Sequence, residues 1–85
     1  MDAKLLELVN EKLRLILDEA VFGEQSENIF KLHYGIDCKR LEPKAISKEV
    51  KLPMKKLKVE LTKIDNRVFN ILKKHDLFDE MYSSK

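Results

Sequence analysis

The sequence predicts a small all-α domain of about four helices that contains a helix-turn-helix. Two observations carry this prediction. Apolar residues recur at spacings of three and four along most of the chain, and only two Gly and two Pro interrupt the pattern. The length of 85 residues, 44% of them hydrophobic, supports one domain over residues 1–85. No run of the sequence approaches the ~18 consecutive apolar residues of a membrane span.

The first expected helix runs from an N-cap at Asp2 to a stop at Gly23. Leu6, Val9 and Leu13 recur in it at helical spacing. Gly23 can adopt the left-handed backbone conformation that commonly follows a helix. Further leucines widen the apolar stripe, so this helix is expected to contact more than one neighbour.

The second expected helix begins at a Ser26 cap and runs to about Tyr34. Gly35 supplies its C-terminal stop, and Ile36 is placed to fold back onto the last turn, as is common for such caps. A polar loop over residues 37–42 follows.

Proline marks the start of each remaining helix. Pro43 suits the first turn of a short helix that continues to about Lys51, and Pro53 repeats the signal before a helix of about 22 residues. One apolar seam with spacings of 4, 3, 4 and 3 runs along this long helix: Leu57, Leu61, Ile64, Val68 and Ile71. In the tail, residues 76–85, a last turn is expected to dock through Leu77, Phe78 and Met81, and Tyr82 to Lys85 are expected to fray.

The stretch over about residues 43–75 has the order of a helix-turn-helix, a short helix, a tight turn and a long helix. Small or apolar residues occupy the places where the two helices approach or the turn packs: Ile46, Ser47, Val50, Leu52 and Leu57. Two positions depart from the pattern. Lys51 stands where the turn favours Gly, and Glu60 stands where an apolar residue is expected, so that Leu61 takes that role. An ordinary helical hairpin is the alternative interpretation.

Charge is segregated along the chain. Residues 1–42 hold six Lys or Arg and nine Asp or Glu, a net charge of −3, whereas residues 43–75 carry a net charge of +7. A concentration of positive charge of this kind favours an anionic partner. The alternative is that lysines simply solubilise exposed helices.

The long helix is expected to present a mixed polar surface opposite its seam. At 100° per residue, lysines alternate there with residues that can contact bases in a major groove. Val59 is the informative member, because an apolar residue on an exposed face needs an explanation, although scattered exposed apolar residues are common. The residues predicted to bind DNA are Lys55, Lys56, Lys58, Val59, Thr62, Lys63 and Asn66.

Catalytic and metal-binding signatures are missing from the sequence. Two histidines and one cysteine make no zinc pattern, and two separated glycines make no phosphate loop, so neither an enzyme nor a cofactor is expected. His33 is interpreted as a structural histidine on a helix. The single Cys38 excludes an internal disulfide and fits a reducing compartment, so a cytoplasmic protein is expected.

The segment Glu27 to Asp37, ENIFKLHYGID, resembles the region 4.1 helix of the bacterial sigma-70 family. Its matching residues are Leu32, Tyr34, Gly35, Ile36 and Asp37, with His33 in place of a usual arginine. After the loop, AISKEVKLP resembles the first helix and turn of region 4.2. The resemblance covers about residues 26–74. Residues 1–22 lack the promoter-melting part of a complete sigma factor.

The resemblance implies a transcription module that contacts promoter DNA and the flap of the RNA polymerase β subunit. It implies polymerase-binding residues at His33 and Tyr34. Consensus recognition of the −35 promoter element is not implied, because Met54, Lys55 and Val59 replace the family's base-reading Arg, Glu and Gln. Lys56 and Lys58 would retain contacts to phosphates.

The rival hypothesis is a helical protein-interaction module, a regulator that binds polymerase or a sigma factor without contacting DNA. In that case the seam of the long helix or the first helix pairs with another protein. The same seam could pair two copies of the chain as a homo-oligomer.

Overall fold

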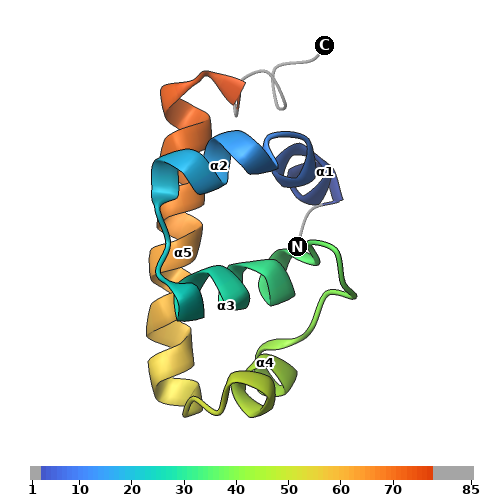
Figure 1. The fold of residues 1–85 in the computed structure, drawn as a ribbon, viewed down its shortest axis with the longest axis vertical. Coiled ribbons are helices and arrows are strands. Elements are labelled where there is room, and N and C mark those ends of the chain that lie inside the picture. The colour runs from blue at the N-terminus through green and yellow to red at the C-terminus, as the bar shows by residue number, and fades with distance from the viewer. Residues whose placement is uncertain (1–2, 78–85) are drawn as a thin grey trace. The chain divides into compact units, whose positions relative to one another are not determined.

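The computed structural model describes residues 3–77, and over these residues the chain forms five helices and no strand. They are α1 (Ala3–Glu11), α2 (Leu13–Ala20), α3 (Glu24–Tyr34), α4 (Pro43–Val50) and α5 (Met54–Lys74) (Figure 1). The all-α fold class is confirmed. In the described part of the chain, no helix is both long and apolar enough to cross a membrane.

The contacts of the chain divide it into two compact units. In its described part, one unit comprises residues 3–21 and 66–77, and the other comprises residues 22–65. Helix α5 contributes its second half to the first unit and its first half to the second. The single domain expected from the sequence therefore stays a prediction.

The first expected helix is two helices. Lys12 separates α1 from α2 with φ −103° and ψ 21°, and the two axes diverge in Figure 1. Hydrogen bonds continue across the break, since the Lys12 N–H donates to the Leu8 carbonyl (3.0 Å) and the Ile16 N–H donates to the Lys12 carbonyl (2.9 Å). Neither Gly nor Pro lies in this stretch, so no local signal announced the break.

Two terminal assignments made from the sequence are wrong. Helix α2 ends at Ala20, and the residue after it, Val21, takes the left-handed conformation (φ 49°, ψ 55°). Gly23 is instead the extended N-cap of α3. Ser26 lies inside α3 and does not cap it. A β-branched residue is rare at positive φ, so the sequence favours Gly23 over Val21 as the left-handed residue after this helix. The tertiary structure nevertheless places Val21 in that conformation. The N-cap expected at Asp2 lies outside the described residues.

The end of α3 follows its sequence signal. Gly35 is left-handed (φ 69°) and its N–H donates to the Lys31 carbonyl, as expected for a stop. The Ile36 N–H donates to the same carbonyl (2.9 Å), and the Ile36 side chain is buried. The fold-back of Ile36 onto the last turn is thus confirmed. Further along, the Leu41 N–H donates to the Leu32 carbonyl (3.0 Å) and ties the loop to α3.

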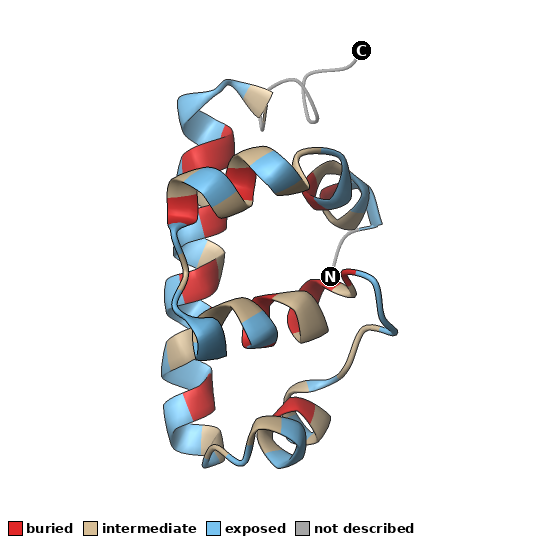
Figure 2. Ribbon diagram, viewed as in Figure 1, coloured by how far each residue is buried: buried red, intermediate tan, exposed pale blue. Residues whose placement is uncertain are grey.

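Proline and periodicity place the last two helices correctly. Pro43 is the first residue of α4, and α5 has 21 residues where about 22 were expected. Buried residues follow one side of α5 in Figure 2. All five seam residues are among them: Leu57, Leu61, Ile64, Val68 and Ile71. In the tail, Leu77 is half-buried, and Phe78, Met81 and residues 82–85 lie outside the described residues.

Candidate nucleic-acid interface

Ser47 closes the turn between α4 and α5. Its carbonyl accepts hydrogen bonds from the N–H groups of Lys51 and Leu52, and its hydroxyl donates to the Leu52 carbonyl. Lys51 adopts the left-handed conformation (φ 55°) at the position where the sequence pattern favours Gly. The turn therefore spans only residues 51–53, so α5 starts directly beside α4.

The buried and exposed faces of the first half of α5 agree with the prediction. Leu57, Leu61 and Ile64 are buried within residues 22–65. Every residue predicted to bind DNA is exposed: Lys55, Lys56, Lys58, Val59, Thr62, Lys63 and Asn66. Six of the seven belong to the unit of residues 22–65, and Asn66 belongs to the other unit. These six form the exposed face of α5 within residues 22–65.

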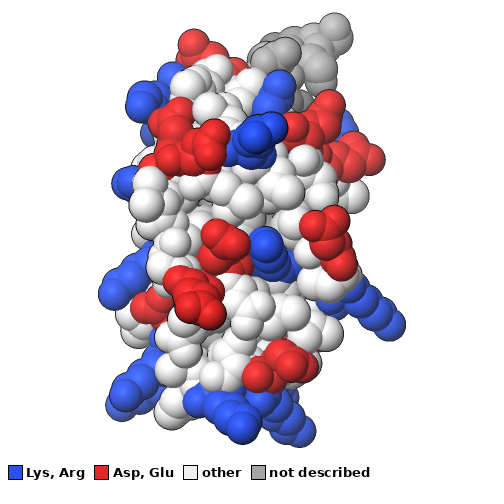
Figure 3. All heavy atoms as spheres, in the orientation of Figure 1, with Lys and Arg blue, Asp and Glu red and all other residues white. Residues whose placement is uncertain are grey.

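Most lysines of α4, the turn and the first half of α5 form no ion pair within residues 3–77. Within residues 3–77, Lys63 is the only lysine of α4, the turn and the first half of α5 with an ion pair, a contact of 3.9 Å with Glu60. The lysines that form none there are Lys44, Lys48, Lys51, Lys55, Lys56 and Lys58. Figure 3 shows Lys and Arg atoms gathered over α4 and the start of α5. Unpaired exposed ammonium groups are available to an anionic partner.

Ser26 of α3 binds Glu60, the one carboxylate among residues 54–64 of α5. Its hydroxyl donates to Glu60 Oε1 (3.2 Å), and Lys63 lies 3.9 Å from Glu60 Oε2. The Glu60 side chain is only 28% exposed. Glu60 stands where the sequence pattern favours an apolar residue, and the hydrogen bond from Ser26 of α3 satisfies its carboxylate.

A hollow of about 310 Å³ lies beside Val59, and its walls are mostly apolar. It is lined by the apolar Leu52 and Val59 and by Lys55 and Lys56, exposed residues whose long hydrocarbon stems can cover apolar surface. Gln25 and Glu60 complete the lining. The hollow thus joins an apolar floor to a positively charged rim.

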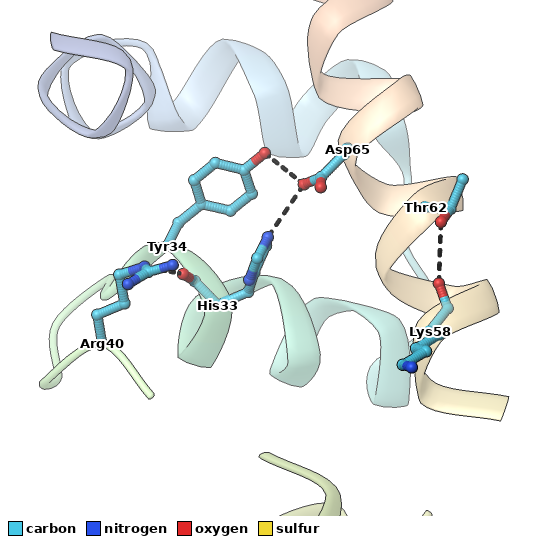
Figure 4. A network of polar contacts seen from close by, with 6 residues as sticks. All are labelled: His33, Tyr34, Arg40, Lys58, Thr62 and Asp65. Atoms are coloured by element: carbon cyan, nitrogen blue, oxygen red, sulfur yellow. Dashed lines mark hydrogen bonds and ion pairs between the residues drawn. The ribbon is translucent and has the colours of Figure 1, made fainter. Parts of the chain in front are cut away.

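His33 and Tyr34 are buried, and both bind Asp65 of α5 (Figure 4). The Tyr34 hydroxyl donates to Asp65 Oδ1 (2.7 Å), and His33 Nε2 lies 3.2 Å from the same oxygen. His33 Nδ1 is buried and has no hydrogen-bond partner. Arg40 Nε donates to the His33 carbonyl (3.1 Å) and fastens the following loop. His33 thus contributes to the contact between α3 and α5.

This burial changes the expected role of His33 and Tyr34 in binding polymerase. Side chains that are 7% and 2% exposed do not present a contact surface to a partner. They fix the end of α3 against α5, so any partner at this end would meet the exposed residues around them, among them Asp37 and Lys39.

The pKa values of the cluster reflect this environment. Burial raises the pKa of the Asp65 carboxyl, but the hydrogen bonds from His33 and Tyr34 outweigh burial and leave that pKa below its ordinary value. Burial and the neighbouring Asp65 carboxylate raise the pKa of the Tyr34 phenol far above its ordinary value. Asp65 is therefore held ionised and Tyr34 neutral.

The other unit has a different arrangement of cations. Lys74 Nζ lies 3.0 Å from Glu19 Oε1, His75 Nε2 binds Glu19 Oε2, and Arg67 donates to the Glu19 carbonyl (3.2 Å). Hydrogen bonds from Lys74 and His75 hold the pKa of the Glu19 carboxyl below its ordinary value. Positive charge at this end of α5 is partly compensated by Glu19.

Several members of the candidate interface were not singled out from the sequence. Lys44 and Lys48 enter the sequence analysis only through the net charge, Lys51 only as a departure from the turn pattern, and Ser26 only as a helix cap. The net charge of +7 over residues 43–75 was the one signal that included the lysines of α4. Ser26 and Glu60 are 34 residues apart, and no local pattern pairs them.

The chain offers no metal centre in its described part, where no group of three His, Cys, Asp or Glu side chains could hold an ion. No family model matches the chain, and comparisons with curated proteins and with solved structures give no match. Function must therefore be inferred from the interface itself.

Proposed function

We propose that this chain is a transcription module that binds duplex DNA through α4, the turn and the first half of α5, and that docks on RNA polymerase. One observation carries the DNA-binding part. Six exposed lysines of α4, the turn and the first half of α5 form no ion pair within residues 3–77, and those of α5 lie on the side opposite its buried seam. In this proposal the turn with α4 and α5 is a helix-turn-helix, and α5 is its recognition helix.

Electrostatics favour DNA as the anionic partner. Lysines that neutralise phosphates release condensed counterions, and this release drives non-specific binding. The first turn of α5 adds the partial positive charge of a helix N-terminus, which also favours phosphate. Lys55, Lys56 and Lys58 lie within this first turn and a half.

Docking on RNA polymerase rests on the resemblance to region 4 of the sigma-70 family. Its strongest support is the stop at Gly35, whose left-handed backbone and buried neighbour Ile36 agree with the matched segment. His33 and Tyr34 would act by orienting this end of α3, because both are buried. The β-subunit flap is the expected docking site.

Binding of the chain to a pool of random duplex DNA, measured by fluorescence anisotropy at several salt concentrations, tests the proposal. The log–log slope against salt should be about −0.9 per phosphate contacted, so about −5 if all six lysines take part. A pulldown of RNA polymerase, with free β flap as competitor, tests the second part. Undetectable DNA binding at low salt would contradict the proposal.

A protein-interaction module is the second candidate, and the first unit favours it. Helices α1 and α2 carry several half-buried leucines: Leu6, Leu8, Leu13, Leu15 and Leu17. A partner protein that covered them would bury further apolar surface. This candidate predicts that the chain associates with another protein or with a second copy of itself, which light scattering would detect. It also predicts weak DNA binding that does not change when the lysines of α4 and α5 are replaced.

A further inference from the structure

We infer that the hollow beside Val59 receives the 5-methyl group of thymine in the major groove, so that the chain selects thymine-containing DNA. The inference rests on the proposed DNA binding and deepens it by naming the base feature that is read. Thymine is distinguished in the major groove by this methyl group, the one apolar group that a base pair exposes there.

Val59 is the first piece of the apolar surface. It is 52% exposed, and the only other large hydrophobic residue that is exposed among residues 3–77 is Val21, at 77%. Val59 lines the hollow together with Leu52 and the hydrocarbon stems of Lys55 and Lys56. An apolar floor under a rim of ammonium groups fits a methyl group that is carried on a polyanion.

Thr62 extends this surface by one helical turn. Its hydroxyl donates to the Lys58 carbonyl (3.0 Å), so the donor is used within the helix and its methyl remains as the apolar part of the side chain (Figure 4). Residues three apart on a helix are surface neighbours, so Thr62 and Val59, both exposed, share one side of α5. Both residues therefore offer hydrocarbon to the groove.

Ser26 holds the Glu60 carboxylate away from the DNA that would contact Val59 and Thr62. Glu60 is the acidic residue that lines the hollow, and a carboxylate free to turn outward would repel phosphates. The hydrogen bond from Ser26 Oγ to Glu60 Oε1 holds it toward α3. Ser26 is thus a positioning residue for the surface.

A protein side chain would also fit an apolar hollow of about 310 Å³. The charge of the rim decides between the two occupants. The lysines that line and flank the hollow, Lys55, Lys56 and Lys58, have no ion pair within residues 3–77 and point to an anionic partner of high charge density. Duplex DNA supplies that charge on both sides of each thymine methyl.

Removal of the methyl group from DNA tests the inference directly. Duplexes enriched from a random pool by repeated binding to the wild-type chain are resynthesised with each thymine replaced in turn by deoxyuridine. At one or more positions this change should weaken binding about fourfold per methyl group withdrawn from the hollow. Val59→Ala should remove most of that difference, and the matched control Val21→Ala should leave it unchanged.

Thr62 provides a second pair of variants. Thr62→Ser keeps the hydroxyl and loses the methyl, so it should reduce the discrimination between thymine and deoxyuridine. Thr62→Val keeps a methyl and loses the hydroxyl, so it should preserve the discrimination. Ser26→Ala should weaken binding to both kinds of duplex equally, since it frees the Glu60 carboxylate.

The outcomes separate this inference from the proposed function. Salt-dependent binding with no thymine preference overturns the inference and leaves DNA binding intact. A thymine preference that persists unchanged in both Val59→Ala and Thr62→Ser also overturns it, because the methyl group is then read elsewhere. Absence of DNA binding at low salt overturns the inference and the proposed function together.

Discussion

The Tyr34 hydroxyl donates a 2.7 Å hydrogen bond to Asp65 Oδ1 and thereby joins the end of α3 to α5. His33, one residue earlier, lies 3.2 Å from the same oxygen. One carboxylate thus holds two consecutive side chains of α3. Hydrogen bonds to a charged group are stronger than neutral ones, so this contact fixes the end of α3 more firmly than packing alone.

We predict that Asp65→Asn lowers the free energy of unfolding by about 1–3 kcal/mol at pH 7, because a charged acceptor is lost. The pKa of Asp65 is lowered in the folded chain, so its contribution is present above the unfolded value of 3.8 and is lost as pH falls through the folded value. The variant should therefore lose less stability than wild type between pH 7 and strong acid. Urea denaturation across pH measures this, with the exposed Asp18→Asn as control.

If Asp65→Asn and wild type show the same loss of stability in acid, the carboxylate is not held by His33 and Tyr34 as described. Tyr34→Phe gives an independent check. It removes the 2.7 Å hydrogen bond and should cost about 1–2 kcal/mol while the buried ring is retained.

The seam of α5 should carry much of the stability of residues 22–65. Leu61 and Ile64 are 8% and 2% exposed, so Leu61→Ala and Ile64→Ala should each cost about 2–5 kcal/mol. Thermal unfolding followed by circular dichroism measures the loss. Thr62→Ala, on the exposed side of the same helix, is the control and should change stability by less than about 0.5 kcal/mol. Melting of both core variants near the wild-type temperature would contradict the packing described here.

Gly35 should tolerate no larger residue. Its φ is 69°, and a Cβ there would lie 3.2 Å from Arg40 Cβ and 3.3 Å from the Arg40 nitrogen. Gly35→Val should therefore cost at least about 1–3 kcal/mol in unfolding free energy, from backbone strain together with the close contact. Gly23 is the matched control, since a Cβ there meets nothing within 4 Å and Ser is a preferred N-cap residue. Gly23→Ser should leave stability unchanged or slightly higher, and an equal loss in both variants would rule out the explanation.

The lysines of α5 should divide into two classes in DNA binding. Lys56→Ala with Lys58→Ala should weaken binding on every sequence and flatten the salt slope by about two contacts. Lys73→Ala with Lys74→Ala should have a smaller effect, because Lys74 already pairs with Glu19. Anisotropy titrations at several salt concentrations compare the two double variants. Equal losses in both would mean that the lysines act only through net charge, and the protein-interaction candidate would then be favoured.

Local sequence signals were sufficient to predict the start of α4, the end of α3 and the buried side of α5. Pro43 started α4, Gly35 ended α3, and the 4-3-4-3 spacing located the buried side of α5. These signals work because proline and glycine act on their own backbone, and because helical periodicity fixes which side chains share a face. The exposure of all seven residues predicted to bind DNA follows from the same periodicity, since the opposite face of a buried seam must meet solvent.

Only the tertiary structure decided the break at Lys12, the left-handed Val21, and the partners of Ser26 and Tyr34. Ser26 binds Glu60 and Tyr34 binds Asp65 across 34 and 31 residues, so no neighbour in the sequence reveals either pair. The hollow beside Val59 likewise combines Gln25 of α3 with the turn and α5. Such contacts depend on which helix faces pack together, and this packing is determined by the burial of apolar residues over the whole fold. The sequence alone determined only where the apolar and polar faces lie on each helix.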